Sequence, residues 1–242
     1  MAATAGLFHA KSLVYLLRLS MGGTRLSADG LPAYSRSMLD FFAIFSLPRH
    51  LQLDTVALER VFYAQSRKLH PDRFAARPAA EQESVLAESS QLNDAYRTLK
   101  DPIQRTQHLL TLEGVALEEQ SKAATDAART SGAEKKQLIP PELLEEVFEL
   151  NMQLMEIKAA RQMGDDADPD LRRDLEAAAH AFNIKMAETQ AELEQLWIVW
   201  DAALDRGDTA AQASAKVALV ALLNKRSYLR NLIRDVTTAL EA

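Results

Sequence analysis

The residues with the clearest chemical potential form one short segment, His70-Pro71-Asp72-Arg73. Proline fixes its own φ at about −65° and disfavours helix in the residue before it, so His70 must end any helix that precedes it. Asp72 is then left in an exposed turn, where its carboxylate can pair with a cation on another molecule. We therefore predict that His70 and Asp72 act in recognition rather than in acid–base catalysis.

The remaining candidate groups form no catalytic or metal-binding pattern. No two histidines have the spacing of helical metal ligands; they are His9, His50, His70, His108 and His180. The chain has no cysteine, which excludes disulfides and thiolate-held clusters within it. It also lacks a glycine-rich phosphate loop. We expect no metal, no cofactor and no enzymatic activity of its own.

The composition favours a helical globular protein. Of 242 residues, 48% are hydrophobic and 26% charged, with only eight glycines and eight prolines. We expect an all-α fold. The net charge of −6 argues against nucleic acid as a partner, because phosphate binding needs a basic face. The apolar run Leu13 to Leu19 is too short for a bilayer, so no membrane partner is expected either.

Two amphipathic helices are predicted on either side of the motif. Asp54 can cap a helix that runs to Leu69. A second helix is expected to start at Arg77-Pro78-Ala79 and to end at Asp101-Pro102. Apolar residues recur in both at spacings of three and four, which predicts an antiparallel hairpin. The loop that carries the motif then projects from the end of this hairpin.

Basic side chains gather on the first of these helices and in the loop. Residues 54–73 contain four Lys or Arg against three Asp or Glu; the basic residues are Arg60, Arg67, Lys68 and Arg73. Such a patch suits an acidic protein surface. A solvated helix face is the alternative interpretation.

The C-terminal half predicts three helices in an antiparallel bundle over residues 142–242. The first runs from Pro141 to about Met163, and the second from Pro169 to near Arg206. The third carries apolar residues at helical spacing up to Leu240. A polar connection over residues 115–141 is expected to link this bundle to the N-terminal helices.

The first bundle helix has more apolar surface than a core needs. One stripe about 80° wide is the expected core face: Leu143, Val147, Leu150, Leu154 and Ile157. A second stripe, on a different side of the helix, consists of Leu144, Phe148, Met152 and Met155. Three acidic residues border it: Glu142, Glu145 and Glu149. Either the N-terminal helices cover this surplus, or it is an exposed docking patch.

Residues 1–37 are expected to lie outside the fold. They are basic, with scattered Leu and Ser, as organelle transit peptides are. Alternatively, translation begins at Met38. The second interpretation predicts a cytoplasmic bacterial protein, and the first a protein of the mitochondrial matrix.

These segments together resemble the HscB family. The resemblance rests on Asp40-Phe41-Phe42, on the form His70-Pro71-Asp72-Arg73-Phe74, on residues 91–99 with Asp101-Pro102, and more loosely on residues 144–154. It implies a J-domain over residues 38–114. It also implies a co-chaperone that stimulates the ATPase of an HscA-like chaperone of the DnaK class, and that delivers the iron–sulfur scaffold IscU to it.

The resemblance also suggests where the two partners bind. The chaperone site would comprise His70, Pro71, Asp72 and Arg73 with Arg60, Arg67 and Lys68. Leu144, Phe148 and Glu149 fall on client-binding positions of the family, and we add Glu145, Met152 and Leu222. The family often has Met where this chain has Glu145, and a charged residue where it has Met152. Alternative functions are a general J-domain co-chaperone with other clients, or a helical adaptor in which the motif is a mere turn.

Overall fold

The computed structural model describes residues 39–115, 140–163 and 168–241, and every element of secondary structure in these ranges is helical. The protein is all-α, as predicted. The expected N-terminal extension, most of the expected linker and residues 164–167 lie outside the described residues. Residues Leu39–Ala242 group by their contacts into one compact unit. No helix in the described ranges is both long enough and apolar enough to cross a membrane.

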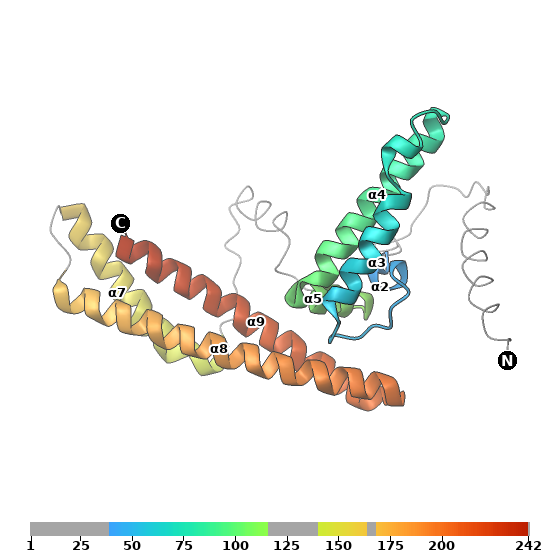
Figure 1. The fold of residues 1–242 in the computed structure, drawn as a ribbon. Helices are drawn as coiled ribbons and strands as arrows, with labels where there is room; N and C mark the ends of the chain where they lie inside the picture. Colours follow the sequence, from blue (N-terminus) through green and yellow to red (C-terminus); the bar gives the residue numbers. More distant parts are fainter. Residues whose placement is uncertain (1–38, 116–139, 164–167, 242) are drawn as a thin grey trace, which may run out of the picture. The chain divides into compact units, whose positions relative to one another are not determined.

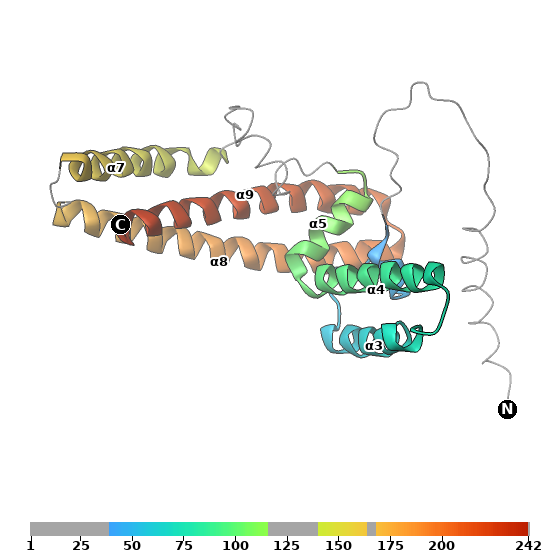
Figure 2. The same cartoon turned by 90° about the horizontal axis from the view of Figure 1, so that it is seen from above.

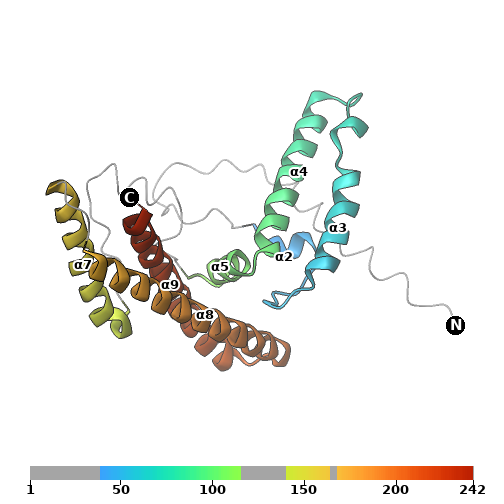
Figure 3. The same cartoon turned by 60° about the vertical axis from the view of Figure 1, so that its left-hand side comes forward.

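The N-terminal region, residues 39–115, is built around a helical hairpin. Its elements are α2 (Phe41–Ile44), α3 (Thr55–Lys68), the short 3-10 helix η1 (Pro71–Arg73), α4 (Ala79–Lys100) and α5 (Pro102–Leu112). Helices α3 and α4 lie side by side and antiparallel, with η1 in the loop at their shared end (Figures 1 and 3).

Aspartate caps fix where two of these helices begin. The Asp54 carboxylate accepts hydrogen bonds from the backbone N–H groups of Val56 at 2.9 Å and Ala57 at 3.0 Å. Asp101 caps α5 in the same way. These four bonds satisfy donors that the first helical turn leaves free. The cap at Asp54 and the end of the second helix at Asp101-Pro102 lie where the sequence predicted them.

The C-terminal bundle is the predicted antiparallel three-helix arrangement (Figure 2). It consists of the short 3-10 helix η2 (Pro141–Leu143), α7 (Leu144–Met163), α8 (Pro169–Arg206) and α9 (Thr209–Glu241). Gly207 joins α8 to α9 with φ of 66°, a left-handed conformation that favours glycine. Helices α8 and α9 contact each other far more extensively than either contacts α7.

One hydrophobic core joins the N-terminal region to the bundle. We call it the junction cluster; its buried members include Phe42, Leu51, Leu92, Leu99 and Leu109 from the N-terminal region, and Leu193, Trp197, Trp200, Leu219 and Leu223 from α8 and α9. Because these side chains pack together, the N-terminal region is held against α8 and α9 by the same burial that stabilises its own helices.

Buried polar groups reinforce this junction at the loop before α3. The Asp201 carboxylate of α8 accepts from the backbone N–H groups of Leu51 at 2.6 Å and Gln52 at 2.9 Å. The Trp200 indole donates to the Arg49 carbonyl at 3.0 Å. From the other side, Arg105 donates to the Leu51 carbonyl at 2.9 Å. The loop is therefore bound to α8 and α5 through the backbone groups of Arg49, Leu51 and Gln52, and these bonds do not depend on the side chains of the loop.

A second core lies within the bundle. The predicted core stripe of α7 is buried there: Leu143, Val147, Leu150 and Ile157 are buried, and Leu154 is partly buried. They pack against Leu171, Leu175 and Phe182 of α8 and against Leu229 and Val236 of α9. Helical periodicity alone predicts this face, because residues three and four positions apart lie on the same side of a helix and can pack together against its neighbours.

Candidate functional site

The motif His70-Pro71-Asp72 occupies the turn between α3 and α4. His70 is extended and caps η1, since the backbone N–H of Asp72 donates to His70 Nδ1 at 3.3 Å. The Asp72 side chain is 89% exposed, and its Oδ2 lies 3.5 Å from the same ring nitrogen. The imidazole thus holds the turn while the carboxylate remains open to solvent. An open carboxylate in a turn can pair with a cation of another molecule.

Basic side chains lie along α3 and in this turn, as the sequence indicated. Arg60, Arg67, Lys68 and Arg73 are all exposed, and within the described residues none of them forms an ion pair with a carboxylate. The Arg73 guanidinium donates to the Arg67 carbonyl at 3.3 Å, which fixes it beside the end of α3. These cations are therefore available to a partner.

Tyr63 lies on the same face of α3, although it is not among the residues predicted from the sequence. Its ring is 53% exposed, and positions 60, 63 and 67 share one side of a helix. An exposed aromatic residue between two arginines is a common feature of protein-binding surfaces. Its spacing of three residues from Arg60 and four from Arg67 is the signal in the sequence that could have revealed it.

The surplus stripe of α7 is exposed rather than covered by the N-terminal region. Leu144 is 53% and Phe148 68% exposed, and Met152 and Met155 are similarly open. Glu145 and Glu149 are exposed beside them. We call Leu144, Phe148, Met152 and Met155 the exposed α7 face. Four large apolar side chains in a row, bordered by acids, are a candidate protein-binding surface.

Leu222 lies on α9, whereas the other predicted client-binding residues lie on α7. It is half-buried and packs against the junction cluster. One turn further along α9, Lys225 Nζ lies 3.8 Å from Glu142 Oε1, which places this part of α9 near the start of α7. Leu222 therefore takes part in the packing around the junction cluster, and its role in client binding stays a prediction.

The buried ionisable groups serve the fold. His108 Nε2 accepts from the Phe41 backbone N–H at 3.1 Å, its ring stacks on that of Phe41, and burial lowers its pKa. Burial raises the pKa of Asp201, against the opposing effect of its two backbone hydrogen bonds. Among the described residues, no three His, Asp or Glu side chains are grouped so that they could hold a metal ion.

Comparison with known proteins identifies relatives of this chain. No family model matches the chain. Co-chaperone protein HscB homologues from two strains of Vibrio cholerae serotype O1 are each 32% identical over 176 residues, which is 69% of this chain and 86% of theirs. A homologue of the same name from Chromobacterium violaceum is 38% identical over 88 residues, covering 36% of this chain and 50% of its own.

Solved structures of similar proteins share the fold. The chaperone HscB from Vibrio cholerae superposes with a TM-score of 0.50 at 24% identity, covering 84% of this chain and 98% of that one. Human co-chaperone protein HscB gives a TM-score of 0.50 at 20% identity, covering 90% and 93% respectively. Together with the identity and coverage of the Vibrio cholerae relatives, this places the chain in the HscB family of co-chaperones.

Proposed function

We propose that this protein is a co-chaperone of iron–sulfur cluster assembly that brings a scaffold protein to an ATP-hydrolysing chaperone. Residues 39–115 act as a J-domain and stimulate an HscA-like chaperone of the DnaK class. The bundle binds an IscU-like scaffold. Hydrolysis belongs to the chaperone, and any cluster is held by the scaffold, so this chain itself is neither an enzyme nor a metal carrier. We place this function in the cytoplasm.

The observation that carries the proposal is the presence of two separate, exposed surfaces in one compact unit. The open carboxylate of Asp72, with the unpaired cations of α3 beside it, offers a site for the chaperone. The exposed α7 face offers an apolar site for the scaffold. Neither surface uses residues of the other, so both partners can be bound together.

The junction cluster gives a physical reason for having the chaperone site and the scaffold site in one chain. Main-chain hydrogen bonds from Leu51 and Gln52 to Asp201, and the shared core, hold the N-terminal region against α8. A scaffold bound to α7 is then presented at a high effective concentration to a chaperone that engages Asp72. Stimulation of hydrolysis and delivery of the client become one event.

The decisive test is a pair of measurements on the full chain. Calorimetric titration with an IscU-like scaffold should show saturable binding, and single-turnover ATP hydrolysis by an HscA-like chaperone should accelerate when the chain is added. Acceleration without scaffold binding would indicate a general J-domain co-chaperone with other clients. The absence of both effects would leave only a helical adaptor and would refute the proposal.

A further inference from the structure

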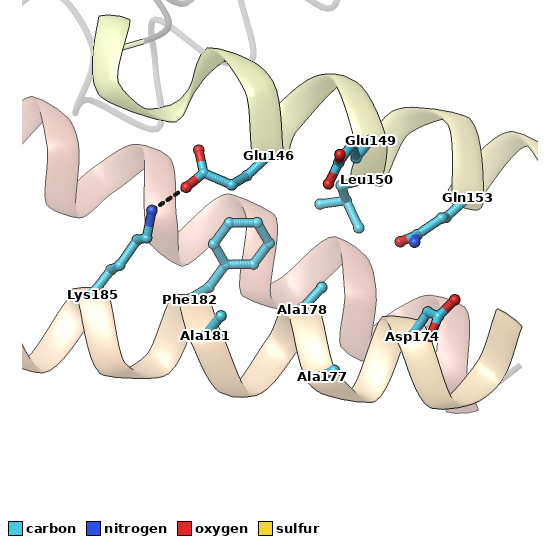
Figure 4. A pocket seen from close by; sticks show the side chains of 10 residues that line it. All are labelled: Glu146, Glu149, Leu150, Gln153, Asp174, Ala177, Ala178, Ala181, Phe182 and Lys185. Atoms are coloured by element: carbon cyan, nitrogen blue, oxygen red, sulfur yellow. Dashed lines mark hydrogen bonds and ion pairs between the residues drawn. The ribbon is translucent and has the colours of Figure 1, made fainter. Parts of the chain in front are cut away.

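A cavity of about 290 Å³ lies between α7 and α8, beside the exposed α7 face (Figure 4). Its apolar floor is formed by the buried side chains of Leu150 and Phe182. Ala177, Ala178 and Ala181 line the α8 side. Alanine at these positions leaves space that longer side chains would fill, so the two helices do not close on each other here.

One end of this groove is already occupied by a cation of the chain itself. Lys185 of α8 reaches across to Glu146 of α7, and the two form an ion pair (Figure 4). The hydrogen bond from Lys185 lowers the pKa of Glu146. The Lys185 side chain is only 29% exposed, because its aliphatic part is covered while its ammonium group meets the carboxylate. A long basic side chain is therefore well accommodated between these helices.

The rest of the groove is acidic and lacks such a cation. Gln153 of α7 and Asp174 of α8 lie at the end away from Lys185, and Glu149 lies between the two ends (Figure 4). In the part of the chain that the structure describes, neither Glu149 nor Asp174 has an ion-pair partner. Within the described residues, these two carboxylates and the amide oxygen of Gln153 thus border the apolar floor without forming an ion pair.

The groove continues the exposed α7 face. At about 100° per residue, Glu149 and Gln153 follow Phe148 and Met152 around the helix on the side that turns toward α8. A protein that covers Phe148 therefore has the groove at its edge, within reach of one long side chain.

We infer that this groove receives a lysine or arginine side chain of the protein that binds the exposed α7 face. The inference rests on the proposed function and specifies the chemistry of its client. The aliphatic stem of that residue packs on the exposed methyl groups of Ala177 and Ala181, and its charged end meets Glu149 and Asp174. Asp174 is then a specificity-determining residue on a helix that contributes nothing to the exposed α7 face itself.

The test compares two charge-neutralising variants of α8, Asp174→Asn and Glu176→Gln. Glu176 is the matched control, since it lies two residues away, pairs with Arg172 and does not line the groove. Each full-length variant is titrated calorimetrically with an IscU-like scaffold at low and at physiological ionic strength. Asp174→Asn should weaken binding about two- to fivefold at low salt, the range of an exposed ion pair. The loss should shrink as salt screens the charges, and Glu176→Gln should bind like the wild type.

A double-mutant cycle then identifies the partner residue. Lysines and arginines of the scaffold are changed to glutamate one at a time and titrated against the wild type and Asp174→Asn. For one of them, the combined loss should be smaller than the sum of the single losses.

The possible failures are distinguishable. If Asp174→Asn binds like Glu176→Gln while Phe148→Ala loses binding, the groove inference is refuted and the proposed function stands. The groove inference would also be refuted if, for every basic residue of the scaffold, the loss of binding free energy in the double mutant equalled the sum of the two single losses. If the wild type does not bind the scaffold at all, the proposed function fails and the inference with it.

Discussion

Phe148 and Leu150 are two residues apart on α7 and lie on opposite sides of it, with 68% of Phe148 exposed and only 1% of Leu150. A step of two residues turns a helix through about 200°, so adjacent positions can serve different purposes. Phe148 belongs to the exposed α7 face, whereas Leu150 packs against α8 and α9. This pair allows binding and stability to be tested separately within one helical turn.

Replacing Leu144 and Phe148 together by Ala should weaken scaffold binding by about 2–4 kcal/mol, as expected when the anchors of an interface are truncated. Since both side chains are more than half exposed, thermal stability should change little. Stimulation of the chaperone without the scaffold should persist, because the turn at Asp72 is unchanged. Titration and a thermal melt of the same preparation measure both effects.

Leu150→Ala is the matched core variant and should cost about 2–5 kcal/mol of unfolding free energy. Urea unfolding of both variants gives the comparison. Equal destabilisation of the two would mean that the exposed α7 face is needed for the fold, contrary to its exposure.

Asp72→Ala should abolish stimulation of the chaperone ATPase while leaving scaffold affinity and the melting temperature unchanged. The reason is that the carboxylate is almost fully exposed and supports only its own turn. Asp94→Ala is a suitable control, because Asp94 is an exposed acid on α4 that pairs with Arg97. Single-turnover ATP hydrolysis reports the difference, and full stimulation by Asp72→Ala would remove the basis for a J-domain.

Asp201→Ala should destabilise the protein by about 1–3 kcal/mol, because it leaves the buried N–H group of Leu51 and the partly buried N–H group of Gln52 without this acceptor. Asp205→Ala removes only an exposed contact with His50, so it should cost less than about 1 kcal/mol. Urea denaturation of the two variants makes the comparison. A similar small loss in both would show that the junction is held by apolar packing alone.

Stability should fall as the solution is acidified below about pH 6.5, the pKa of an unperturbed imidazole. Burial lowers the pKa of His108 in the folded protein, so the unfolded chain binds the extra proton first. In that window the unfolded state is therefore favoured as pH decreases. Protonation would also remove the acceptor for the Phe41 N–H group. Melting curves across this range should show the effect.

The control for this pH dependence is a second histidine. His108→Gln should have a flatter stability profile than the wild type, whereas His180→Gln, at an exposed position of α8, should keep the wild-type slope. A wild-type slope in His108→Gln would assign the pH dependence to other groups.

The parts of this fold that depend on one helix at a time could be predicted from the sequence. Asp54 caps the start of α3, Asp101-Pro102 ends α4, and the two stripes of α7 follow from periodicity. Asp72 was identified because Pro71 restricts the backbone locally. Each of these inferences uses residues that are close together in the chain.

Contacts between distant segments could not be predicted in this way. Asp201 meets Leu51 across 150 positions, and the sequence around each residue carries no sign of the other. The groove beside Phe182 also depends on how two helices approach, not on the pattern of either one. Leu222 is a further example. Its contact with the junction cluster depends on how α9 packs against other segments, and the residues next to it in the chain do not indicate that contact.

The junction cluster determines how freely evolution or an engineer could recombine this protein. Leu51 and Leu99 share a core with Leu193 and Trp200, so the boundary between the two halves passes through hydrophobic interior. A foreign segment in place of residues 39–115 would bring side chains of different size and shape against Trp200, and these would leave cavities or clash with it. The halves are therefore not interchangeable modules, and a working chimera would have to exchange the facing surface of α8 and α9 along with the segment that it replaces.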